Sequence, residues 1–382
     1  MTDLVYSAGF RTLVYQIMIV AAILLAGFYL YANVTHNLQA QSIATGYRFL
    51  NEVSQFEIGE KLIAYSSRST YFDALVVGLL NTLYVSFFGV ILATILGFSV
   101  GISRVSGNWL LMKVATAYVE FVRNIPVILQ VIFWVAVTRN LPAPRQALEV
   151  FGVGFLSNRG LTFAVPVGNP VHVWMLMACG VGIVLCFFAK YWARKHRERT
   201  GNYIETLWIY LGLVAGLPLL VWLFAGAPLQ ISFPERQGFN FIGGASVSPE
   251  FVALLLGIAI YSSSYIAEIV RAGIQATPKG QIEAARSISL KPSFITRYVV
   301  LPQALRMIVP PLTSQYVSLF KNSSIAVVVG YPDLVNIGNT VMNQTGQAVE
   351  AIVIMMIVYL AISITTSLLM NFYNRVVAIK ER

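Results

Sequence analysis

The sequence RAGIQATPKGQIEAARSISLKPSFITRYVVLPQALR, from Arg271 to Arg306, is a long polar and basic segment between two apolar runs. Thr277 followed by Pro278 is typical of a helix start, because a hydroxyl oxygen can cap free backbone N–H groups and proline already has the helical φ. A short helix is therefore expected from Pro278 to about Ser289. A polar, ordered segment of this kind is a candidate for docking to something in the water phase.

A second helix start follows within the same segment. Lys291 precedes Pro292, and the residue before a proline is pushed out of the helical region. Pro302 is expected to end this second helix, and Pro310 with Pro311 to kink the start of the next apolar run. The segment is thus predicted to be a rigid pair of short helices with a bend, which transmits force better than a flexible loop.

The composition indicates whether the rest of the chain is surrounded by water or by lipid. Of the 382 residues, 57% are hydrophobic and only 11% are charged, with a mean hydropathy of +0.71. Soluble domains carry about 25% charged residues, so this composition indicates an integral membrane protein. The net charge of +10 could suggest nucleic acid, but the basic residues recur in clusters between apolar runs and form no single stripe. The charge therefore reports membrane topology.

The apolar runs predict the fold class. A membrane-spanning helix needs about twenty mainly apolar residues, so that its backbone hydrogen bonds are satisfied internally. Eight runs meet this requirement, roughly 13–32, 76–100, 114–138, 171–189, 206–226, 250–270, 308–330 and 350–373. The first run has no small-residue cleavage site and is expected to be a retained span. The expected fold is all-α, a polytopic membrane protein of about eight transmembrane helices.

Basic residues orient these spans. With a cytoplasmic N-terminus, seventeen of the 26 Lys and Arg residues fall in loops on that side, including a cluster over 190–199. Topology and attraction to anionic lipid explain this cluster, although contact with a partner is an alternative. The opposite face carries only seven, on the longer segments 33–73, 139–170, 227–249 and 331–349. The positive-inside rule predicts that both termini are cytoplasmic.

Two regions depart from a regular span pattern. Pro126 lies inside the third span, so a bent or broken helix is expected there. Residues 33–73 lack a spanning run and are expected to form an amphipathic segment along the outer surface, with Glu52, Glu57 and Glu60 solvated.

The sequence lacks motifs for chemistry within the chain. No Gly-Lys dipeptide occurs, which excludes a phosphate-binding loop ending in Gly-Lys-Ser or Gly-Lys-Thr. The three histidines are scattered, and Cys179 and Cys186 have no His or acidic neighbour, so both cysteines are expected to be packing residues. The chain is predicted to bind no metal and no cofactor and not to be an enzyme. Energy for any active process must come from elsewhere.

The first short helix of the polar segment carries a pair of small residues. Ala284 and Ala285 would let a partner approach the backbone closely, and Glu283 beside them could accept hydrogen bonds from that partner. An ordinary surface helix on a cytoplasmic loop is the alternative, and helix signals alone favour neither interpretation.

The spacing after this triplet is more specific. It resembles the signature of the permease subunits of bacterial ATP-binding-cassette (ABC) importers, which is Glu-Ala-Ala, a glycine four residues after the second alanine, and a closing Leu-Pro. Here Ser289 stands where the family has glycine, and the motif closes with Leu301 and Pro302. The resemblance implies a set of ATPase-coupling residues: Gly280, Glu283, Ala284, Ala285, Ser289, Leu301 and Pro302.

The resemblance extends to the polar amino acid uptake branch of that family. It rests on GLLNTLYVS from Gly78, YVEFVRNIPVILQ from Tyr118, EIVRAGIQATPKGQIEAAR from Glu268, PQALRMIVPPL from Pro302 and the triplet Lys321–Ser323. The second, third, sixth, seventh and eighth spans would form the five-helix type I importer core. The remainder is similar to the longer permeases of the general L-amino acid transporter group.

The expected domain organisation follows from this resemblance. Residues 1–73 would be an extra span with a periplasmic segment, and 74–140 the first part of the permease core. Residues 141–249 would be an insertion with two spans, and 250–382 the second part of the core, including the coupling loop 271–306.

The resemblance also implies a function. The chain would be the transmembrane permease subunit of an importer that moves amino acids across the bacterial inner membrane by alternating access, with ATP and Mg bound by two separate ATPase subunits. The other implied partners are a second homologous permease as a heterodimer, a periplasmic amino-acid-binding protein and membrane lipid, with no nucleic acid. The alternative is a secondary, ion-coupled transporter, which would show inverted repeats and need no cytoplasmic docking helices.

Polar residues at membrane depth are candidates for the substrate pathway, because ionisable groups there are costly and usually functional. A free amino acid presents a carboxylate and an ammonium group, which need donors and acceptors in the site. The candidates are Arg123, Gln130, Glu268, Lys321, Asn322 and Ser323.

Pairing within the helices is the competing interpretation. Glu120 would pair with Arg123, and Glu268 with Arg271, each across one helical turn. For Gln130 the alternative is a polar contact that holds helices together. Lys321 has no acidic residue within reach on its own helix and is the favoured functional charge.

Overall fold

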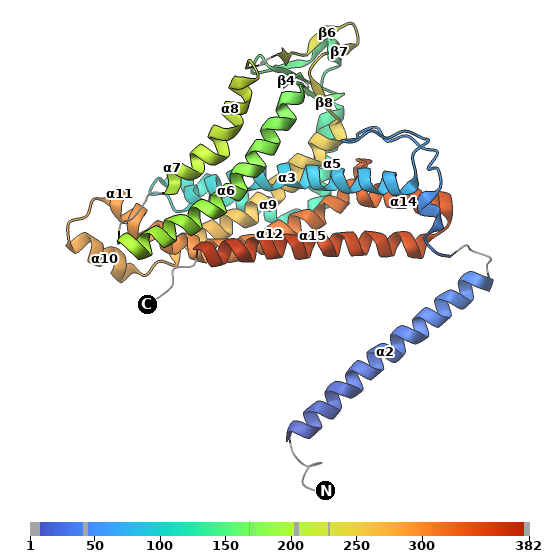
Figure 1. Cartoon of the computed structure of the whole chain (residues 1–382), viewed down its shortest axis with the longest axis horizontal. Coiled ribbons are helices and arrows are strands. Elements are labelled where there is room, and N and C mark those ends of the chain that lie inside the picture. Colours follow the sequence, from blue (N-terminus) through green and yellow to red (C-terminus); the bar gives the residue numbers. More distant parts are fainter. Residues whose placement is uncertain (1–7, 41–44, 168, 202–205, 228–229, 378–382) are drawn as a thin grey trace. The chain divides into compact units, whose positions relative to one another are not determined.

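The computed structural model describes residues 8–40, 45–167, 169–201, 206–227 and 230–377 (Figure 1). Lys380 and Arg382, which contribute to the predicted cytoplasmic charge, lie outside the described residues. The chain divides into two compact units: unit 1 comprises Met1–Val137 and Glu250–Arg382, and unit 2 comprises Thr138–Pro249.

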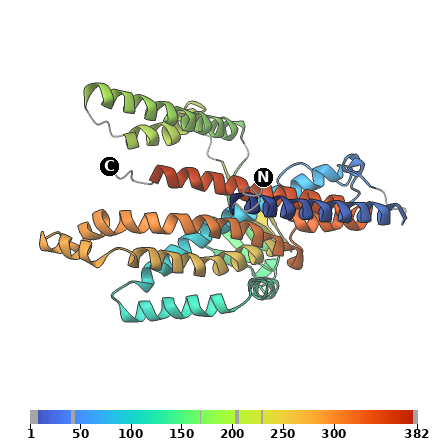
Figure 2. The ribbon, with the colours of Figure 1, turned by 90° about the horizontal axis from the view of Figure 1, so that it is seen from below.

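Unit 1 is built from helices, and the spans that the resemblance assigns to an importer core are among them. Its helices are α2 (Ala8–Ala40), α3 (Tyr71–Arg104), α4 (Trp109–Asn124), α5 (Val127–Arg139), α9 (Pro249–Gln275), α10 (Lys279–Ser287), α11 (Pro292–Ile295), α12 (Leu301–Asn322), α13 (Ala326–Val329), α14 (Leu334–Thr345) and α15 (Ala348–Val377). Helices α12 and α15 pack against each other, and α14 packs on both α3 and α15 (Figure 2). Helices α10 and α11 protrude from one end of the unit (Figures 1 and 2).

The predicted spans fall on these helices and on those of unit 2. Among the described residues, five helices are long and apolar enough to cross a membrane: α2, α3, α6 (Pro170–Thr200), α9 and α15. Two bent pairs pass the same test together, α4 with α5 at 103° and Pro292–Val329 with α14 at 51°, and Trp208–Phe224 is a shorter apolar helix. A mostly helical, polytopic membrane fold is therefore confirmed.

Close packing of α3 against α9 depends on glycines spaced four residues apart. A Cβ on Gly97 would lie 2.6 Å from Ile266 Cβ, and a Cβ on Gly101 would lie 2.7 Å from Val270 Cβ. Small residues at this spacing let two membrane helices approach backbone to backbone, where van der Waals contact replaces the missing hydrophobic driving force. This contact positions the C-terminal ends of the two helices beside each other.

Unit 2 shows that the all-α expectation was too narrow. It holds α6, α7 (Thr206–Leu211), a π-helical turn (Gly212–Gly216) and α8 (Leu217–Phe224), together with eight short strands. The strands are β1 (Leu148–Val150), β2 (Gly154–Ser157), β3 (Gly160–Phe163), β4 (Val165–Pro166), β5 (Ile231–Ser232), β6 (Glu235–Gln237), β7 (Asn240–Ile242) and β8 (Ala245–Val247). They form a four-stranded sheet in the order β1-β2-β3-β8 and two pairs, β4-β5 and β6-β7. The two loops predicted to face outward thus pair with each other into one layer.

The segment between the first two spans is not the amphipathic element that was expected. Its described part, residues 45–70, contains one 3-10 turn, Arg48–Asn51, and otherwise irregular backbone. Phe49 and Tyr65 are buried in the core of unit 1 with residues of α3 and α14, so tertiary packing decides its conformation. Glu57 is not simply solvated either: it accepts the backbone N–H of Ser67 at 2.9 Å, which holds the pKa of that carboxylate below its usual range.

The prolines of the polar segment act differently from the prediction. Pro302 does not end the second helix, which continues from α11 through a π-helical turn, Thr296–Val300, into α12. In that turn the Leu301 N–H bonds the Thr296 carbonyl, so the wider loop absorbs the proline that follows. Pro310 and Pro311 lie inside α12 without ending it. The helix is therefore a continuous rod from Pro292 to Asn322.

Candidate transport site and coupling surface

Two spans of unit 1 are broken. Helix α4 ends in Arg123-Asn124 directly before the 103° bend, whereas α12 ends in Lys321-Asn322 and the 51° bend comes later, between Val329 and Leu334. Discontinuous helices of transporters bring backbone polar groups and charged side chains to a site within the membrane. A basic side chain in the last turn also complements the helix dipole, which is a purely structural use. The surroundings of each break distinguish the two uses.

The first break occurs at Pro126, as predicted. Gln130 is buried, and its Nε2 donates to the Val122 carbonyl at 2.8 Å and to the Ile125 carbonyl at 3.0 Å. Both carbonyls lie at the end of α4, where the Val122 carbonyl otherwise accepts the Ile125 N–H at 3.4 Å. Gln130 therefore holds the bend between α4 and α5.

Arg123 does not pair with Glu120. Among the ion pairs of the described residues, none involves either side chain, although both are exposed in the single chain. Instead the Arg123 guanidinium carbon lies 4.9 Å from the centroid of the Tyr265 ring on α9. This cation–π contact keeps the arginine on the surface of α9.

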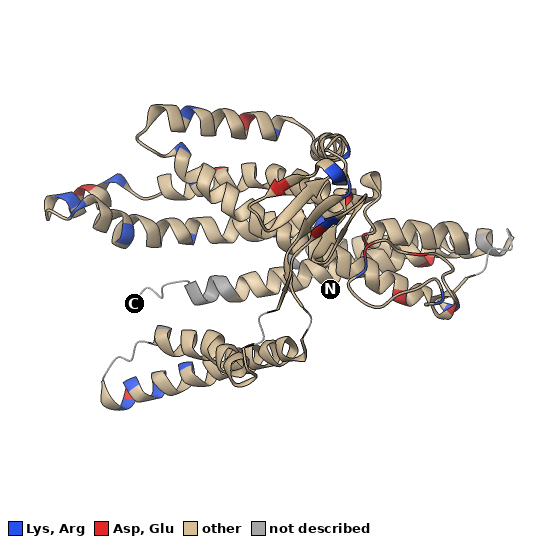
Figure 3. Cartoon of the chain, turned by 90° about the horizontal axis from the view of Figure 1, so that it is seen from above, with Lys and Arg blue, Asp and Glu red and all other residues tan. Residues whose placement is uncertain are grey.

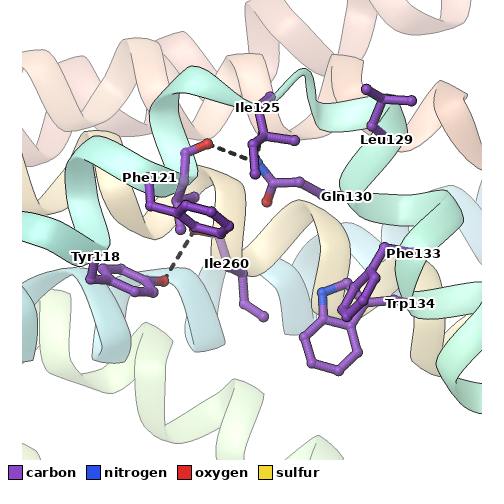
Figure 4. Close-up of a pocket in the computed structure, with 9 residues that line it drawn as sticks. Tyr118, Phe121, Ile125, Leu129, Gln130, Phe133, Trp134 and Ile260 are labelled. Atoms are coloured by element: carbon purple, nitrogen blue, oxygen red, sulfur yellow. Dashed lines mark hydrogen bonds between the residues drawn. The ribbon is translucent and has the colours of Figure 1, made fainter.

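An apolar cavity of about 390 Å³ lies on the concave side of the first break. Residues of α4, α5 and α9 line it: Tyr118, Phe121, Val122, Ile125, Leu129, Gln130, Phe133, Trp134 and Ile260 (Figure 4). The Tyr118 hydroxyl lies 2.7 Å from Ser263 Oγ, and the Gln130 amide is used by the backbone. The cavity therefore offers apolar contact but little free polar capacity.

The second break was not expected from the sequence. After Asn322 the chain forms a 3-10 turn, Ser323–Ile325, then the short α13, a left-handed Gly330 and α14. The buried Asp333 caps α14, because its Oδ1 accepts the Asn336 N–H at 2.8 Å, and its Oδ2 accepts the Tyr359 hydroxyl at 3.3 Å. The return from α13 to α14 is thus fixed by side-chain hydrogen bonds.

The motif GLLNTLYVS on α3 anchors this second break. Asn81 Nδ2 donates to the Pro332 carbonyl at 2.9 Å, and Thr82 Oγ1 accepts the Leu334 N–H at 3.0 Å. A Cβ on Gly78 would come within 3.0 Å of Leu334 Cα, so glycine allows the close contact. These residues lie on one helical face and hold the break from the side.

Lys321 differs from Arg123 in its surroundings. Its side chain is exposed in the single chain, and none of the ion pairs of the described residues involves it. It lines a groove of about 530 Å³ with residues of α15: Val353, Met356, Ile357, Tyr359, Leu360 and Ser363. Asn322 is half-buried beside it, whereas Ser323 is fully buried and donates to the Phe320 carbonyl at 2.7 Å. Lys321 is therefore a cation without a protein counter-charge in a mostly apolar groove.

Glu268 is paired rather than free. Its Oε1 accepts the Arg271 guanidinium at 2.5 Å, which confirms the predicted pair across one turn. Its Oε2 also accepts a hydrogen bond from Arg104 at the end of α3, a partner that was not predicted. Arg271 further bonds Gln275 Oε1 at 2.5 Å. This cluster joins α3 and α9 at the start of the polar segment and leaves Glu268 engaged on both oxygens.

The predicted helix pair of the polar segment is present as α10 and α11. Helix α10 begins at Lys279 after Pro278, but the Thr277 hydroxyl does not cap it: within the described residues that hydroxyl is buried and unbonded. Helix α11 begins at Pro292 after the extended Lys291, as expected. A hydrogen bond between the Gln281 and Gln303 side chains ties α10 to the first turn of α12.

The bend between α10 and α11 explains the position at which glycine was expected. Ser289 has φ +60°, in the left-handed region that favours glycine. The Ser289 N–H bonds the Arg286 carbonyl at 2.8 Å, and the Leu290 N–H bonds the Ala285 carbonyl at 3.2 Å. This is the Schellman pattern of helix ends. The motif therefore specifies a backbone conformation, which serine adopts here at some cost.

The residues around this bend divide into an inner and an outer face. Ala285 is buried against the rest of the loop, whereas Glu283 and Ala284 are exposed. Ile288 is 71% exposed at the tip. Gly280 is exposed, and a Cβ there would meet open space. Leu301 and Pro302 lie in the first turn of α12, behind the tip.

Several positioning residues were missed in the sequence. Asp333 follows a proline and precedes an apolar helical run, which is a helix-start signal that could have identified it. Asn81 and Thr82 carried no such signal, because their partners lie about 250 residues away in the chain. Arg104 was counted only as a topological charge.

Comparison with known proteins gives a consistent result along the whole chain. The family model of the binding-protein-dependent transport system inner membrane component matches residues 89–380. The chain is 46% identical over 380 residues to the general L-amino acid transport system permease protein AapQ of Rhizobium johnstonii, covering 99% of this chain and 94% of that protein. It is 48% identical over 375 residues to the putative amino-acid ABC transporter permease protein YhdX of Escherichia coli, covering 97% and 95%.

A solved structure is also similar. A crystal structure of an amino acid ABC transporter with histidines aligns with 80% of this chain and 94% of that chain, at 22% identity and a TM-score of 0.47. The matched family model and the relatives agree with the polytopic helical membrane fold. The chain belongs to the family of binding-protein-dependent transport system inner membrane components.

Proposed function

We propose that this chain is the permease subunit of an ATP-driven importer that moves amino acids across the bacterial inner membrane by alternating access. The observation that carries the proposal is likeness over 99% of the chain to a general L-amino acid permease. The exposed helix pair α10–α11 supports it, because a chain without a nucleotide-binding loop must receive its energy through a contact. Nothing in the described residues or the relatives supports an ion-coupled mechanism.

The partners follow from the same reasoning. Two ATPase subunits, which would bind ATP and Mg, dock on the bracket formed by α10, the bend at Ser289 and α11. A soluble amino-acid-binding protein delivers substrate on the outer face, in keeping with the family description. A second homologous permease completes the membrane part as a heterodimer. The distribution of basic residues supports cytoplasmic positions for both termini.

The geometry suggests how movement reaches the substrate. A displacement of the bracket acts on a continuous helical rod from Pro292 to Asn322. The other end of this rod carries Lys321 and the second break, whose far side is anchored to α3 through Asn81 and Thr82. Motion of the rod relative to this anchor would rotate Lys321 toward one side of the membrane or the other.

Lys321 is the proposed contact for the substrate carboxylate. It is a cation in a groove of about 530 Å³, a volume that suits a free amino acid, and it has no acidic partner in the described part of the chain. Asn322 and Arg123 are secondary candidates, since both lie at a helix break and neither is fully buried. Gln130, Ser323 and Glu268 are assigned to structural hydrogen bonds and ion pairs.

Reconstitution tests the proposed function. The chain is co-expressed with its partner subunits, the complex is purified, and radiolabelled amino acids are offered to proteoliposomes with the binding protein outside and ATP inside. We expect uptake that requires ATP and persists when ion gradients are collapsed. Uptake that depends on an ion gradient and not on ATP, or purification of the chain without an ATPase subunit, would overturn the proposal.

A further inference from the structure

The outer β-layer of unit 2 contains a compact group of arginines stacked on phenylalanine rings. The Arg145 guanidinium carbon lies 3.8 Å from the centroid of the Phe239 ring, and that of Arg236 lies 4.5 Å from the Phe155 ring. The Phe155 and Phe241 rings stack at 5.2 Å with an interplanar angle of 16°. We call these five residues the Arg–Phe cluster.

The two arginine contacts run in opposite directions between the two outer segments. Arg145 belongs to the segment before α6 and stacks on a ring from the segment after α8, whereas Arg236 belongs to the later segment and stacks on a ring of the earlier one. The Arg236 Nη2 also donates to the Ala147 carbonyl at 3.1 Å. The cluster therefore forms only when both segments are folded together, and its side chains are held in fixed positions.

The arginines nevertheless have unused hydrogen-bonding capacity. Both side chains are exposed, and none of the ion pairs of the described residues involves either one. A guanidinium group has five N–H donors in a planar fork that fits a carboxylate, and an arginine already held on a ring loses less conformational freedom when it binds one. Phe239, 65% exposed, adds an apolar surface beside the Arg145 charge. Arginine and aromatic residues are the usual anchors of protein interfaces.

The position of the cluster within unit 2 indicates which side of the membrane it faces. The layer joins the N-terminus of α6 and the C-terminus of α8, and the opposite end of α6 carries Arg197 and Arg199 in its last turn (Figure 3). The 31 residues of α6 span about 46 Å at 1.5 Å per residue, enough to cross the bilayer. With the basic end in the cytoplasm, the Arg–Phe cluster lies on the outer face.

We infer that the Arg–Phe cluster is a docking surface for an acidic patch of the soluble binding protein. This inference rests on the proposed function, which supplies the partner. Charge complementarity supports it: the segments 139–170 and 227–249 carry four arginines, Arg139, Arg145, Arg159 and Arg236, against two glutamates, Glu149 and Glu235. Ring stacking holds the two guanidinium groups in place, but neither has a counter-charge among the described residues, and carboxylates of a partner would supply one.

The test measures how much binding protein the complete complex needs. The purified complex is placed in nanodiscs of zwitterionic lipid, and the amino-acid-loaded binding protein is titrated while ATP hydrolysis is followed. For the double variant Arg145→Glu/Arg236→Glu we expect the half-saturating concentration to rise at least 10-fold. Arg145→Gln removes one charge without reversing it and is expected to raise that concentration about 3-fold, since one charge-assisted contact is lost.

Arg159→Glu is the matched control. Arg159 is an exposed arginine of the same layer, in the turn between β2 and β3, and it stacks on no ring in the described structure. We expect its reversal to leave the half-saturating concentration within about 2-fold of the unmodified complex, because long-range charge effects are screened. Raising the salt concentration should weaken stimulation of the unmodified complex more than that of the double variant.

Each outcome is decisive. Equal effects of the Arg159 and Arg145 variants, or no effect of the double variant and of Arg145→Gln, would overturn the docking surface while leaving the importer intact. The titration is repeated in nanodiscs that contain anionic lipid. If the double variant raises the half-saturating concentration only there, the cluster binds lipid headgroups and the inference is overturned. If the unmodified complex is not stimulated by a binding protein at all, the proposed function itself fails.

Discussion

The two broken spans of unit 1 begin from the same local pattern and reach different arrangements. Both helices end in a basic residue followed by asparagine, Arg123-Asn124 in α4 and Lys321-Asn322 in α12. At the first break the arginine stacks on Tyr265, and Gln130 bonds the free carbonyls. In the second span Lys321 lies before the break, which is between Val329 and Leu334, and it faces a groove with no acidic partner in the described residues.

The difference lies in what is attached to each span. The first break is held by Gln130 of α5 and by the contact of Arg123 with Tyr265 of α9. The second is held from outside by α3, and its other end continues without interruption into the bracket. Under the proposed mechanism, the first break would be a fixed structural bend, and the second span would carry the movement of the bracket to the substrate. Substitutions at the bracket, at the two basic residues, at Gln130 and at Ser289 test this division.

The largest effect is expected at the bracket that moves the second span. Glu283→Arg reverses a charge on the exposed face of α10, so the docking contact with the ATPase should be lost while the fold is unaffected. We expect ATP-dependent uptake in proteoliposomes to fall to background, while the complex retains ATP hydrolysis that no longer responds to the binding protein. The matched control is Glu198→Arg, the same change at an exposed position near the C-terminal end of α6. Unchanged uptake with Glu283→Arg would remove the bracket from the coupling mechanism.

The second effect compares the two basic residues directly. Lys321→Ala should lower the uptake rate at limiting substrate about 30-fold, because a charge-assisted hydrogen bond to a carboxylate contributes about 2 kcal/mol. Arg123→Ala should lower it about 3-fold or less, since that side chain is already held on Tyr265. Lys321→Arg, which keeps the charge, should recover part of the rate. Equal losses for the two alanine variants, at equal amounts of assembled complex, would show that the breaks do not differ in function.

The third effect concerns the stability of the first break. Gln130→Leu removes the donor that serves two backbone carbonyls, and the unfolding free energy should fall by about 2 kcal/mol because those carbonyls become unsatisfied. Thermal unfolding of the purified complex in detergent measures the change. Gln315→Leu on α12 is the control, since Gln315 is half-buried and no hydrogen bond of its side chain is formed in the structure. A Gln130 variant as stable as this control would mean that the bend is held by other contacts.

The prolines show which helix ends could be predicted from the sequence. Pro126 ends α4 as the sequence indicated, because no wider turn precedes it. Pro302 was expected to end a helix and does not, since the preceding π-helical turn already shifts the hydrogen-bond pattern by one residue. The same device precedes Pro218 in unit 2, where Leu217 N–H bonds the Gly212 carbonyl. Whether a proline ends a helix thus depends on the hydrogen-bond pattern of the turn before it. Rules based on local sequence do not predict that pattern.

The site was predictable in its residue types and not in its partners. Positive charge at membrane depth identified Arg123 and Lys321, and apolar length identified the spans around them. Which charge is free depends on residues distant in the sequence, such as Tyr265 for Arg123 and Arg104 for Glu268. The strands of unit 2 were missed for the same reason, because β3 pairs with β8 across about 80 residues that include α6, α7 and α8.

The smallest effect is expected at Ser289, which sets the angle between α10 and the rod that leads to the second break. Its φ of +60° costs a non-glycine residue about 1 to 2 kcal/mol, and glycine would remove that cost while gaining freedom in the unfolded chain. Ser289→Gly should therefore raise the unfolding free energy of the bracket by about 0.5 kcal/mol, measured as slower amide hydrogen exchange in α10.

Ser287→Gly is expected to change the stability of α10 in the opposite direction. Ser287 is the last residue of α10 and has helical backbone, so glycine there should lower stability by about 0.5 to 1 kcal/mol. If the two glycine variants shift exchange in the same direction, the left-handed conformation at Ser289 is not what determines the bend. If they shift it in opposite directions and uptake by Ser289→Gly is unchanged, the motif requires a backbone conformation at this position. Contact with the ATPase would then depend on the angle between α10 and α11. The side chain at position 289 would matter only because it must allow the left-handed backbone conformation.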